Sequence, residues 1–119
     1  MSLLAVPFAR NIDDVEIERD EFAPGQILEG EPEMGTAILW ESKDGTAICG
    51  VWDVTPGVFA WDFEADELFV VLRGSAEITV EGGSPIAVGP GDMAVFKPGD
   101  RTVWRVVEPL RKVFHIAQS

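Results

Sequence analysis

One stretch decides the fold of this 119-residue chain: GVFAWDFEADELFVVLRG, residues 57–74. It begins and ends with glycine, and its residues 68–72 are all apolar, which is typical of a strand between two turns. A second segment, GPGDMAVFKPG at residues 89–99, repeats this plan of a short strand between glycine-containing turns. We interpret the two segments as strands of one small β-barrel.

The rest of the chain also predicts short strands joined by turns. The expected strands are 15–18, 36–41, 46–54, 68–72, 75–81, 86–88, 93–96, 102–108 and 111–117. Residues 68–72 are apolar on both sides of the pleat, which predicts a strand buried on both faces. Residues 26–35 contain Gly30, Pro32 and Gly35 and are expected to be irregular. Gly50 lies within an expected strand, which predicts a bulge or a close backbone approach at that position. No window combines an N-cap with helical spacing, so the chain is predicted to be an all-β sandwich or barrel.

Length and charge limit the possible partners. The length suits one domain over 1–119, with 1–35 as an N-terminal arm with edge strands and 45–117 as the core barrel. The formal net charge of −12 makes nucleic acids and anionic membrane surfaces poor partners. Cys49 is the single cysteine, which rules out an intramolecular disulfide and agrees with a cytoplasmic location. No stretch approaches the ~20 apolar residues of a membrane-spanning helix.

The two signature segments resemble the two motifs of the cupin superfamily. Glu67, six intervening residues and Gly74 match the second half of the first motif. Gly91-Asp92 and Pro98-Gly99 match the frame of the second motif. The resemblance implies a double-stranded β-helix, the jelly-roll barrel of RmlC-like cupins.

The resemblance also implies where a metal would bind in such a barrel. In metal-binding cupins three histidines and one glutamate converge on the ion. The first two histidine positions fall within 60–63 and the third at Thr102, and none of these residues is histidine. Only Glu67 matches, and a lone carboxylate does not hold a transition metal without nitrogen or sulfur partners. We therefore expect no metal and no cofactor.

Further residues resemble one cupin subgroup. The segments 50–52, 72–74 and 111–113, which read GVW, LRG and RKV, are similar to the ureidoglycine aminohydrolase cupin-domain group and to the ethanolamine-utilisation cupins. Aromatic residues stand there in place of the metal histidines. This resemblance implies, as one alternative, a small-metabolite enzyme of nitrogen or carbon metabolism in which Glu67 acts as the acid/base.

Strand alternation predicts an aromatic pocket that holds one carboxylate. The expected ligand-binding residues are Trp52, Trp61, Phe63, Glu67, Phe69, Phe96, Thr102 and Trp104. Such a pocket suits a flat or apolar small molecule that carries a cation or a hydrogen-bond donor, although the same rings also fit plain core filling. A carboxylate inside an apolar barrel must be protonated or paired. The cations considered for Glu67 are Arg73, Arg101 and Arg105.

We expect no catalytic role for the other reactive side chains of the chain. His115 is expected to be structural or at the surface, and Cys49 to be a buried small hydrophobe. Arg111 and Lys112 are interpreted as an exposed turn.

Three functions stay open at this point. The first is a small-molecule-binding barrel without a metal, whose ligand the sequence does not identify. The second is the enzyme described above, and the third is a structural or interaction module with a filled barrel. We also predict a homodimer, because residues 1–20 can add to the sheet of a second copy and protect an open edge.

Overall fold

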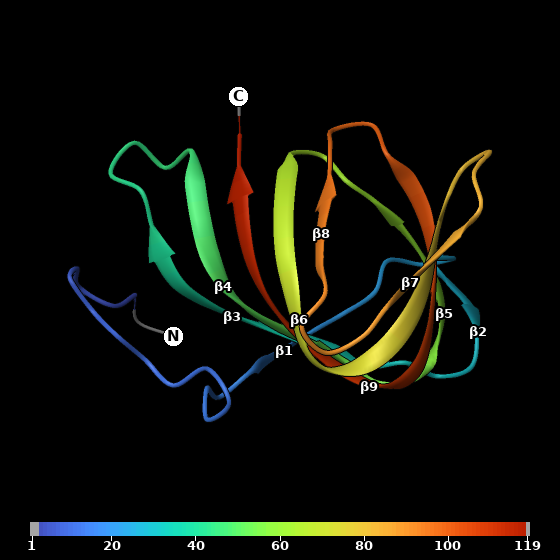
Figure 1. Cartoon of the computed structure of the whole chain (residues 1–119), viewed down its shortest axis with the longest axis horizontal. Coiled ribbons are helices and arrows are strands. Elements are labelled where there is room, and N and C mark those ends of the chain that lie inside the picture. Colours follow the sequence, from blue (N-terminus) through green and yellow to red (C-terminus); the bar gives the residue numbers. More distant parts are fainter. Residues whose placement is uncertain (1–2, 119) are drawn as a thin grey trace.

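The computed structural model describes residues 3–118, and these residues form strands and no helix. In chain order the strands are β1 (Glu18–Asp20), β2 (Ile27–Glu29), β3 (Met34–Glu41), β4 (Ala47–Val54), β5 (Gly57–Asp62), β6 (Asp66–Val80), β7 (Pro85–Val88), β8 (Met93–Phe96) and β9 (Arg101–Ala117). They are hydrogen-bonded into one sheet that curls round on itself (Figure 1). The predicted all-β jelly-roll barrel is confirmed. Within residues 3–118 there is accordingly no helix long and apolar enough to cross a membrane.

Two long strands organise the barrel. β6 and β9 pair antiparallel along nearly their whole length, and both bend midway. The first half of β6 and the second half of β9 lie between β4 and β8, whereas their other halves lie between β5 and β7. Each strand therefore belongs to both walls, which stand on the left and right of Figure 1. The prediction of two separate strands in each of these segments is wrong, because Gly74 and Pro109 bend the strands without ending them.

The bend of β6 depends on Gly74. Its φ is +87°, and a Cβ atom placed there would lie 2.1 Å from the carbonyl oxygen of Pro109 on β9. The pairing between β6 and β9 shifts register at this point. This contact gives a physical reason for glycine at this position. Gly50 has a similar close approach, 2.0 Å from the Ala37 carbonyl oxygen, which confirms the prediction made for it.

Three local expectations need correction. The predicted strand at 15–18 is instead β1 at Glu18–Asp20, and the segment 26–35, expected to be irregular, contains β2 and the start of β3. Burial on both faces of residues 68–72 is also wrong. Phe69 is fully buried, but Leu68 is 39% exposed, because only one face of β6 is turned to the barrel interior.

Aromatic rings fill the interior between the two walls. Trp104, Phe59 and Phe69 are the largest fully buried side chains. Trp104 stacks on Phe59 with 6.0 Å between ring centroids, and it lies 5.7 Å from Phe69. These three rings connect β5, β6 and β9 across the interior. They are core residues in the ordinary sense.

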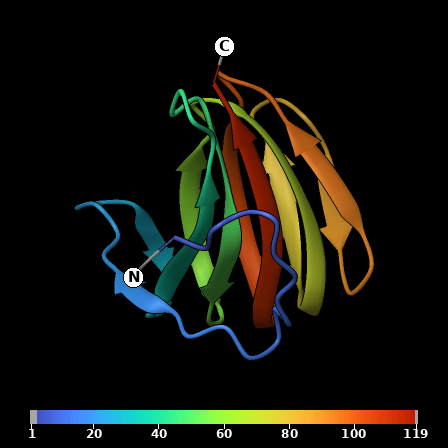
Figure 2. The same cartoon turned by 90° about the vertical axis from the view of Figure 1, so that its left-hand side faces the viewer.

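The N-terminal arm covers part of the outer surface. Figure 2 shows it crossing the outside of the wall that contains β3 and β4. There Val15 is buried against Ala37, Leu39 and Val51, and Leu4 and Ile12 pack on the same cluster. β1 pairs with β3 of the same chain. The homodimer stays a prediction.

Arg111 fixes the arm to the barrel. Its guanidinium donates to both carboxylate oxygens of Asp53, at 2.6 and 2.7 Å, and to the carbonyl oxygens of Ile12 and Asp13, both at 3.0 Å. These hydrogen bonds to Asp53 raise the pKa of Arg111. The interpretation of Arg111 and Lys112 as an exposed turn is wrong, because both residues lie inside β9 and are buried.

Candidate functional site

A buried ion pair lies on the inner face of the barrel. The Lys112 Nζ donates to the Glu67 carboxylate at 2.5 Å, and the two side chains are only 5% and 9% exposed. In the β6–β9 ladder Lys112 is paired with Val71, whereas Glu67 is paired with Ile116. The lysine side chain therefore extends along the sheet to reach the carboxylate. Glu67 lies on β6 and Lys112 on β9, and both side chains point to the inside of the barrel.

The cation beside Glu67 differs from those we considered. Arg73, Arg101 and Arg105 each form an exposed ion pair elsewhere, with Asp13, Glu81 and Glu29 respectively. The expectation that one of these arginines reaches Glu67 is wrong. All three arginines are exposed. Next to Arg101 and Arg105 the buried residues are Thr102 and Trp104, which turn inward.

Four aromatic rings surround the lysine amine. The Nζ lies 4.3 Å from the ring centroid of Phe69, 4.9 Å from Trp52, 5.4 Å from Trp104 and 5.9 Å from Phe114. A cation this close to ring faces is attracted by their quadrupoles. Desolvation nevertheless lowers the pKa of Lys112, and the Glu67 carboxylate opposes that effect. The amine thus loses its proton more readily than an exposed lysine does.

The ion pair lines a small pocket in the barrel. The pocket has a volume of about 140 Å³. Its walls are apolar or aromatic apart from the pair and two outer polar residues; the lining residues are Asp20, Thr36, Ile38, Ile48, Trp52, Trp61, Glu67, Lys112, Phe114 and Ile116. A second pocket of about 250 Å³ adjoins it and shares Ile48, Trp61, Glu67 and Ile116. Glu67 therefore borders both spaces.

The structure separates the predicted ligand residues into two groups. Trp52, Trp61 and Glu67 line the inner pocket, and Phe63 lines the adjoining one. The other four do not line either pocket; these are Phe69, Phe96, Thr102 and Trp104.

Two of the deeper residues are engaged in packing or hydrogen bonding. The Thr102 hydroxyl donates to the Trp61 carbonyl oxygen at 2.6 Å. Phe96 stacks on Phe63 at 4.4 Å with nearly parallel rings. The Trp104 Nε1 differs from them, because it is buried and has no acceptor in the described part of the chain. A buried donor without a partner is costly, so a water or ligand oxygen would stabilise it.

Lys112 is the site residue that sequence reasoning missed. The signal was present in the alternation of β9, where Leu110, Lys112 and Phe114 share one face. Leu110 and Phe114 are apolar, which places the lysine between them on the buried side. The predicted strands 102–108 and 111–117 are separated by Pro109, and this division hides the alternation.

His115 and Cys49 do not contribute to the pocket. They are paired with each other across β4 and β9 on the outer face, and His115 is exposed there, as predicted. Cys49 is only half-buried, and desolvation raises the pKa of its thiol, which makes it a poor nucleophile.

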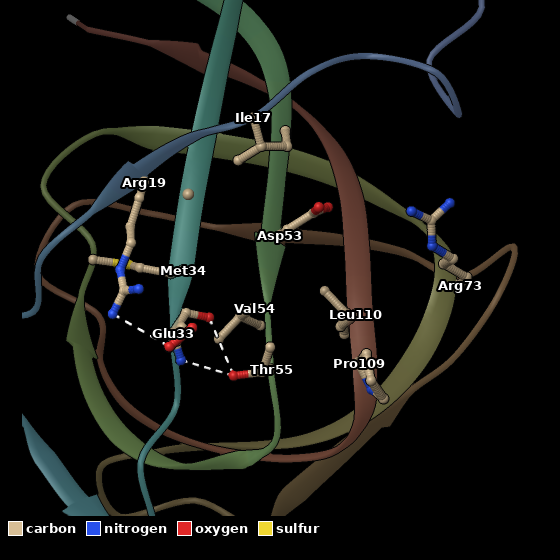
Figure 3. A pocket seen from close by; sticks show the side chains of 11 residues that line it. Ile17, Arg19, Glu33, Met34, Asp53, Val54, Thr55, Arg73, Pro109 and Leu110 are labelled. Carbon is tan, nitrogen blue, oxygen red and sulfur yellow. Dashed lines mark hydrogen bonds and ion pairs between the residues drawn. The ribbon is translucent and has the colours of Figure 1, made fainter.

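A separate hollow lies outside the barrel, beside the N-terminal arm (Figure 3). It has a volume of about 240 Å³, and its charged groups are already paired. Arg19 forms an ion pair with Glu33 at 3.3 Å, and both side chains are more than half exposed. Asp53 is held by Arg111. We therefore place the candidate site in the barrel, where a buried charge pair meets apolar walls.

Comparison with known proteins identifies the family. The family model for the EutQ-like cupin domain matches residues 41–114, more than half of the chain. The chain belongs to the EutQ-like cupin family. No curated protein matches the sequence of this cupin.

Solved structures share its fold. A Pseudomonas syringae pv. tomato protein of unknown function has a TM-score of 0.78 over 87% of this cupin, at 23% sequence identity. The EutQ protein of Clostridium difficile has a TM-score of 0.65 over 74% of it, at 18% identity. A Thermotoga maritima protein is 33% identical but covers only 54% of this cupin, with a TM-score of 0.52 and 73% of its own length matched. This cupin spans 45% of the Pseudomonas protein and 64% of the EutQ protein, so these likenesses describe the fold.

The residues of this cupin do not fit the metal of metal-binding cupins. Among residues 3–118 no three His, Cys, Asp or Glu side chains come together as potential ligands. The Glu67 carboxylate is hydrogen-bonded to the ammonium of Lys112, and the Thr102 hydroxyl to a backbone carbonyl. Nitrogen and thiolate donors, which transition metals prefer, are missing from this set. The chemistry of the site must therefore be sought in the lysine and the carboxylate.

Proposed function

We propose that this cupin binds a small, flat organic molecule in the barrel, over the Glu67–Lys112 pair. The pair is the observation that carries the proposal. Removing two charges from water costs about several kcal/mol per ion. The attraction between the two charges offsets this cost only when their geometry is good. Apolar residues of similar volume would pack the same space without this cost. A charge pair that also lines a pocket therefore favours recognition over plain core filling.

The chemistry of the walls indicates what such a molecule looks like. Trp52, Trp61 and Phe114 offer ring faces and edges to a flat, apolar group. Glu67 accepts a hydrogen bond from the ligand, and Lys112 donates one. An apolar cavity of about 150 Å³ is large enough for benzene, and the inner pocket has about 140 Å³. One ring or a short chain therefore fits the inner pocket, and a polar substituent extends into the adjoining one.

Benzamide is a suitable probe for this proposal, because it has a flat ring and an amide that both donates and accepts. Titration followed by tryptophan fluorescence is expected to give saturable quenching, since Trp52 and Trp61 line the pocket. The same additions are expected to raise the melting temperature. Ile48→Phe, which fills space shared by both pockets, should weaken binding by at least about tenfold, or about 1.4 kcal/mol.

The matched control is Ile86→Phe on β7, where the side chain is 46% exposed and lines neither pocket. It should leave the affinity for benzamide unchanged. Equal affinity in the wild type and the Ile48→Phe variant would contradict a site in the barrel, and an absence of quenching and of any thermal shift in the wild type would dismiss it.

A second candidate is a hydrolytic enzyme of the ureidoglycine aminohydrolase group, with Glu67 as the acid/base. It is favoured by one observation: a proton donor and a proton acceptor, Lys112 and Glu67, share a hydrogen bond at the pocket wall. We expect ammonia release from ureidoglycine that is lost in Glu67→Gln and kept in Glu77→Gln, since Glu77 is exposed on β6 and lines neither pocket. Circular dichroism of both variants separates loss of activity from loss of fold. Wild-type protein that releases no ammonia above the rate in buffer would refute this candidate.

A further inference from the structure

We propose that Lys112 binds a small aldehyde or ketone as a covalent imine. This proposal rests on the proposed function and names the chemical class of the ligand. The geometry supplies the three elements that this reaction needs. They are an amine on a residue that lines a pocket, a proton carrier in contact with that amine, and apolar or aromatic side chains over most of the pocket wall.

The amine meets the first requirement. Lys112 lines the inner pocket although its side chain is only 5% exposed, and four rings lie within 5.9 Å of its Nζ. Lysines that form imines are activated by this kind of desolvation, because only the neutral amine is a nucleophile. The lowered pKa of Lys112, caused by its burial, agrees with this role. The other two lysines, Lys43 and Lys97, are exposed.

Glu67 meets the second requirement. Its carboxylate lies 2.5 Å from the Nζ and borders both pockets, so it contacts the amine and the space where a carbonyl oxygen would lie. Among the side chains lining the inner pocket, the other carboxylate is Asp20, which accepts a hydrogen bond from the Thr36 hydroxyl. Glu67 is therefore the proton carrier of the proposed reaction.

The reaction balances with these two residues alone. The Lys112 ammonium gives one proton to Glu67, and the neutral nitrogen attacks the carbonyl carbon while the C=O π electrons move to oxygen. That oxygen takes the proton from Glu67, and the new C–N nitrogen returns a proton to the carboxylate. Glu67 then protonates the hydroxyl, the C–O bond breaks, and water leaves as the nitrogen lone pair forms C=N. The product is a protonated imine beside the Glu67 carboxylate, so the site keeps its original charge.

The size of the pocket limits the carbonyl compounds that fit. Pockets for drug-sized ligands have volumes of roughly 300 Å³ or more, and the inner pocket has about 140 Å³. The group bonded to the carbonyl carbon is therefore one ring or a short chain. Both propanal and benzaldehyde meet this limit and serve as probes.

The test is reductive trapping of the intact protein. Wild-type protein is incubated with limiting benzaldehyde or propanal and cyanoborohydride, which reduces the protonated imine to a stable amine and spares the free aldehyde. The modified lysine is then located by peptide mapping. We expect Lys112 to be labelled at least about tenfold faster than Lys43 or Lys97, because the pocket that Lys112 lines holds the carbonyl group beside its amine. Benzamide, which forms no imine, should protect Lys112 and leave the two exposed lysines unaffected.

Variants strengthen the test. Lys112→Arg keeps the charge and should abolish trapping at this position, whereas the double variant Lys43→Arg/Lys97→Arg should be trapped as fast as the wild type. Labelling of Lys112 no faster than that of Lys97 in the wild type would overturn the inference, and this result needs no variant that folds. If benzamide still binds in that case, only the imine is lost. If benzamide does not bind either, the proposed function fails with it.

Discussion

Replacing Lys112 with methionine is expected to lower the free energy of unfolding by about 3–5 kcal/mol, the usual cost of leaving one member of a buried ion pair without its partner. Methionine keeps most of the volume and the contacts with the surrounding rings. The loss therefore comes from the Glu67 carboxylate, which is 9% exposed and retains no hydrogen-bond donor in the described residues. Urea unfolding followed by tryptophan fluorescence measures the change.

The double variant Lys112→Met/Glu67→Leu is expected to recover most of this loss. Replacing both charges with apolar groups of similar size is often neutral or stabilising. The matched control is Lys97→Met, which removes an ion pair with Asp100 whose lysine side chain is 74% exposed. An exposed pair of this kind contributes about 0–1 kcal/mol. A double variant as unstable as Lys112→Met would contradict this account of the pair.

Gly74→Ala is expected to have the second large effect, a decrease of at least about 4 kcal/mol in the free energy of unfolding. Because this free energy is typically about 5–15 kcal/mol for a domain, the variant would be close to unfolding. Two causes act together. The φ of +87° is unfavourable for alanine, and the added Cβ would lie 2.1 Å from the Pro109 carbonyl oxygen and 2.5 Å from the Leu110 Cα. Both are backbone atoms of β9, so no side chain can rotate away to relieve the overlap.

The matched control is Gly82→Ala in the turn after β6. Its φ is +80°, but no heavy atom outside its neighbours lies within 4 Å of the added Cβ. This variant therefore measures only the cost of placing alanine in a left-handed backbone conformation, which is about 1–2 kcal/mol. Thermal unfolding of the three proteins separates the two causes. Equal melting temperatures for the two variants would show that β9 moves away at little cost and that the bend does not depend on this contact.

The fold was predictable because turn residues mark its frame. Glu67, Gly74 and the turn at Gly91-Asp92 were sufficient to predict a jelly-roll barrel. In the structure Glu67 and Gly74 both lie within β6, and Gly91-Asp92 form a turn before β8. Hydrophobic alternation correctly predicted that Phe69 and Trp104 face inward. Both are local signals, and a single sequence displays them directly.

The candidate site was only partly predictable, because its centre depends on pairing between distant strands. Glu67 and Lys112 are forty-five positions apart and meet only through the register of β6 against β9. A proline usually indicates the end of a strand, so Pro109 concealed that β9 continues through it. The covering of the outer wall by the N-terminal arm depends likewise on Arg111, whose partners lie far away in sequence.

The continuity of β6 and β9 through both walls affects how a ligand enters the barrel. Because each strand runs through both walls, the walls cannot swing apart like a hinged lid without breaking the ladder that unites them. We therefore expect the cavity to change shape little on binding, so that little conformational entropy is lost on association. Molecules too large for the opening should be rejected outright by steric exclusion, so the selectivity of this barrel should depend sharply on ligand width.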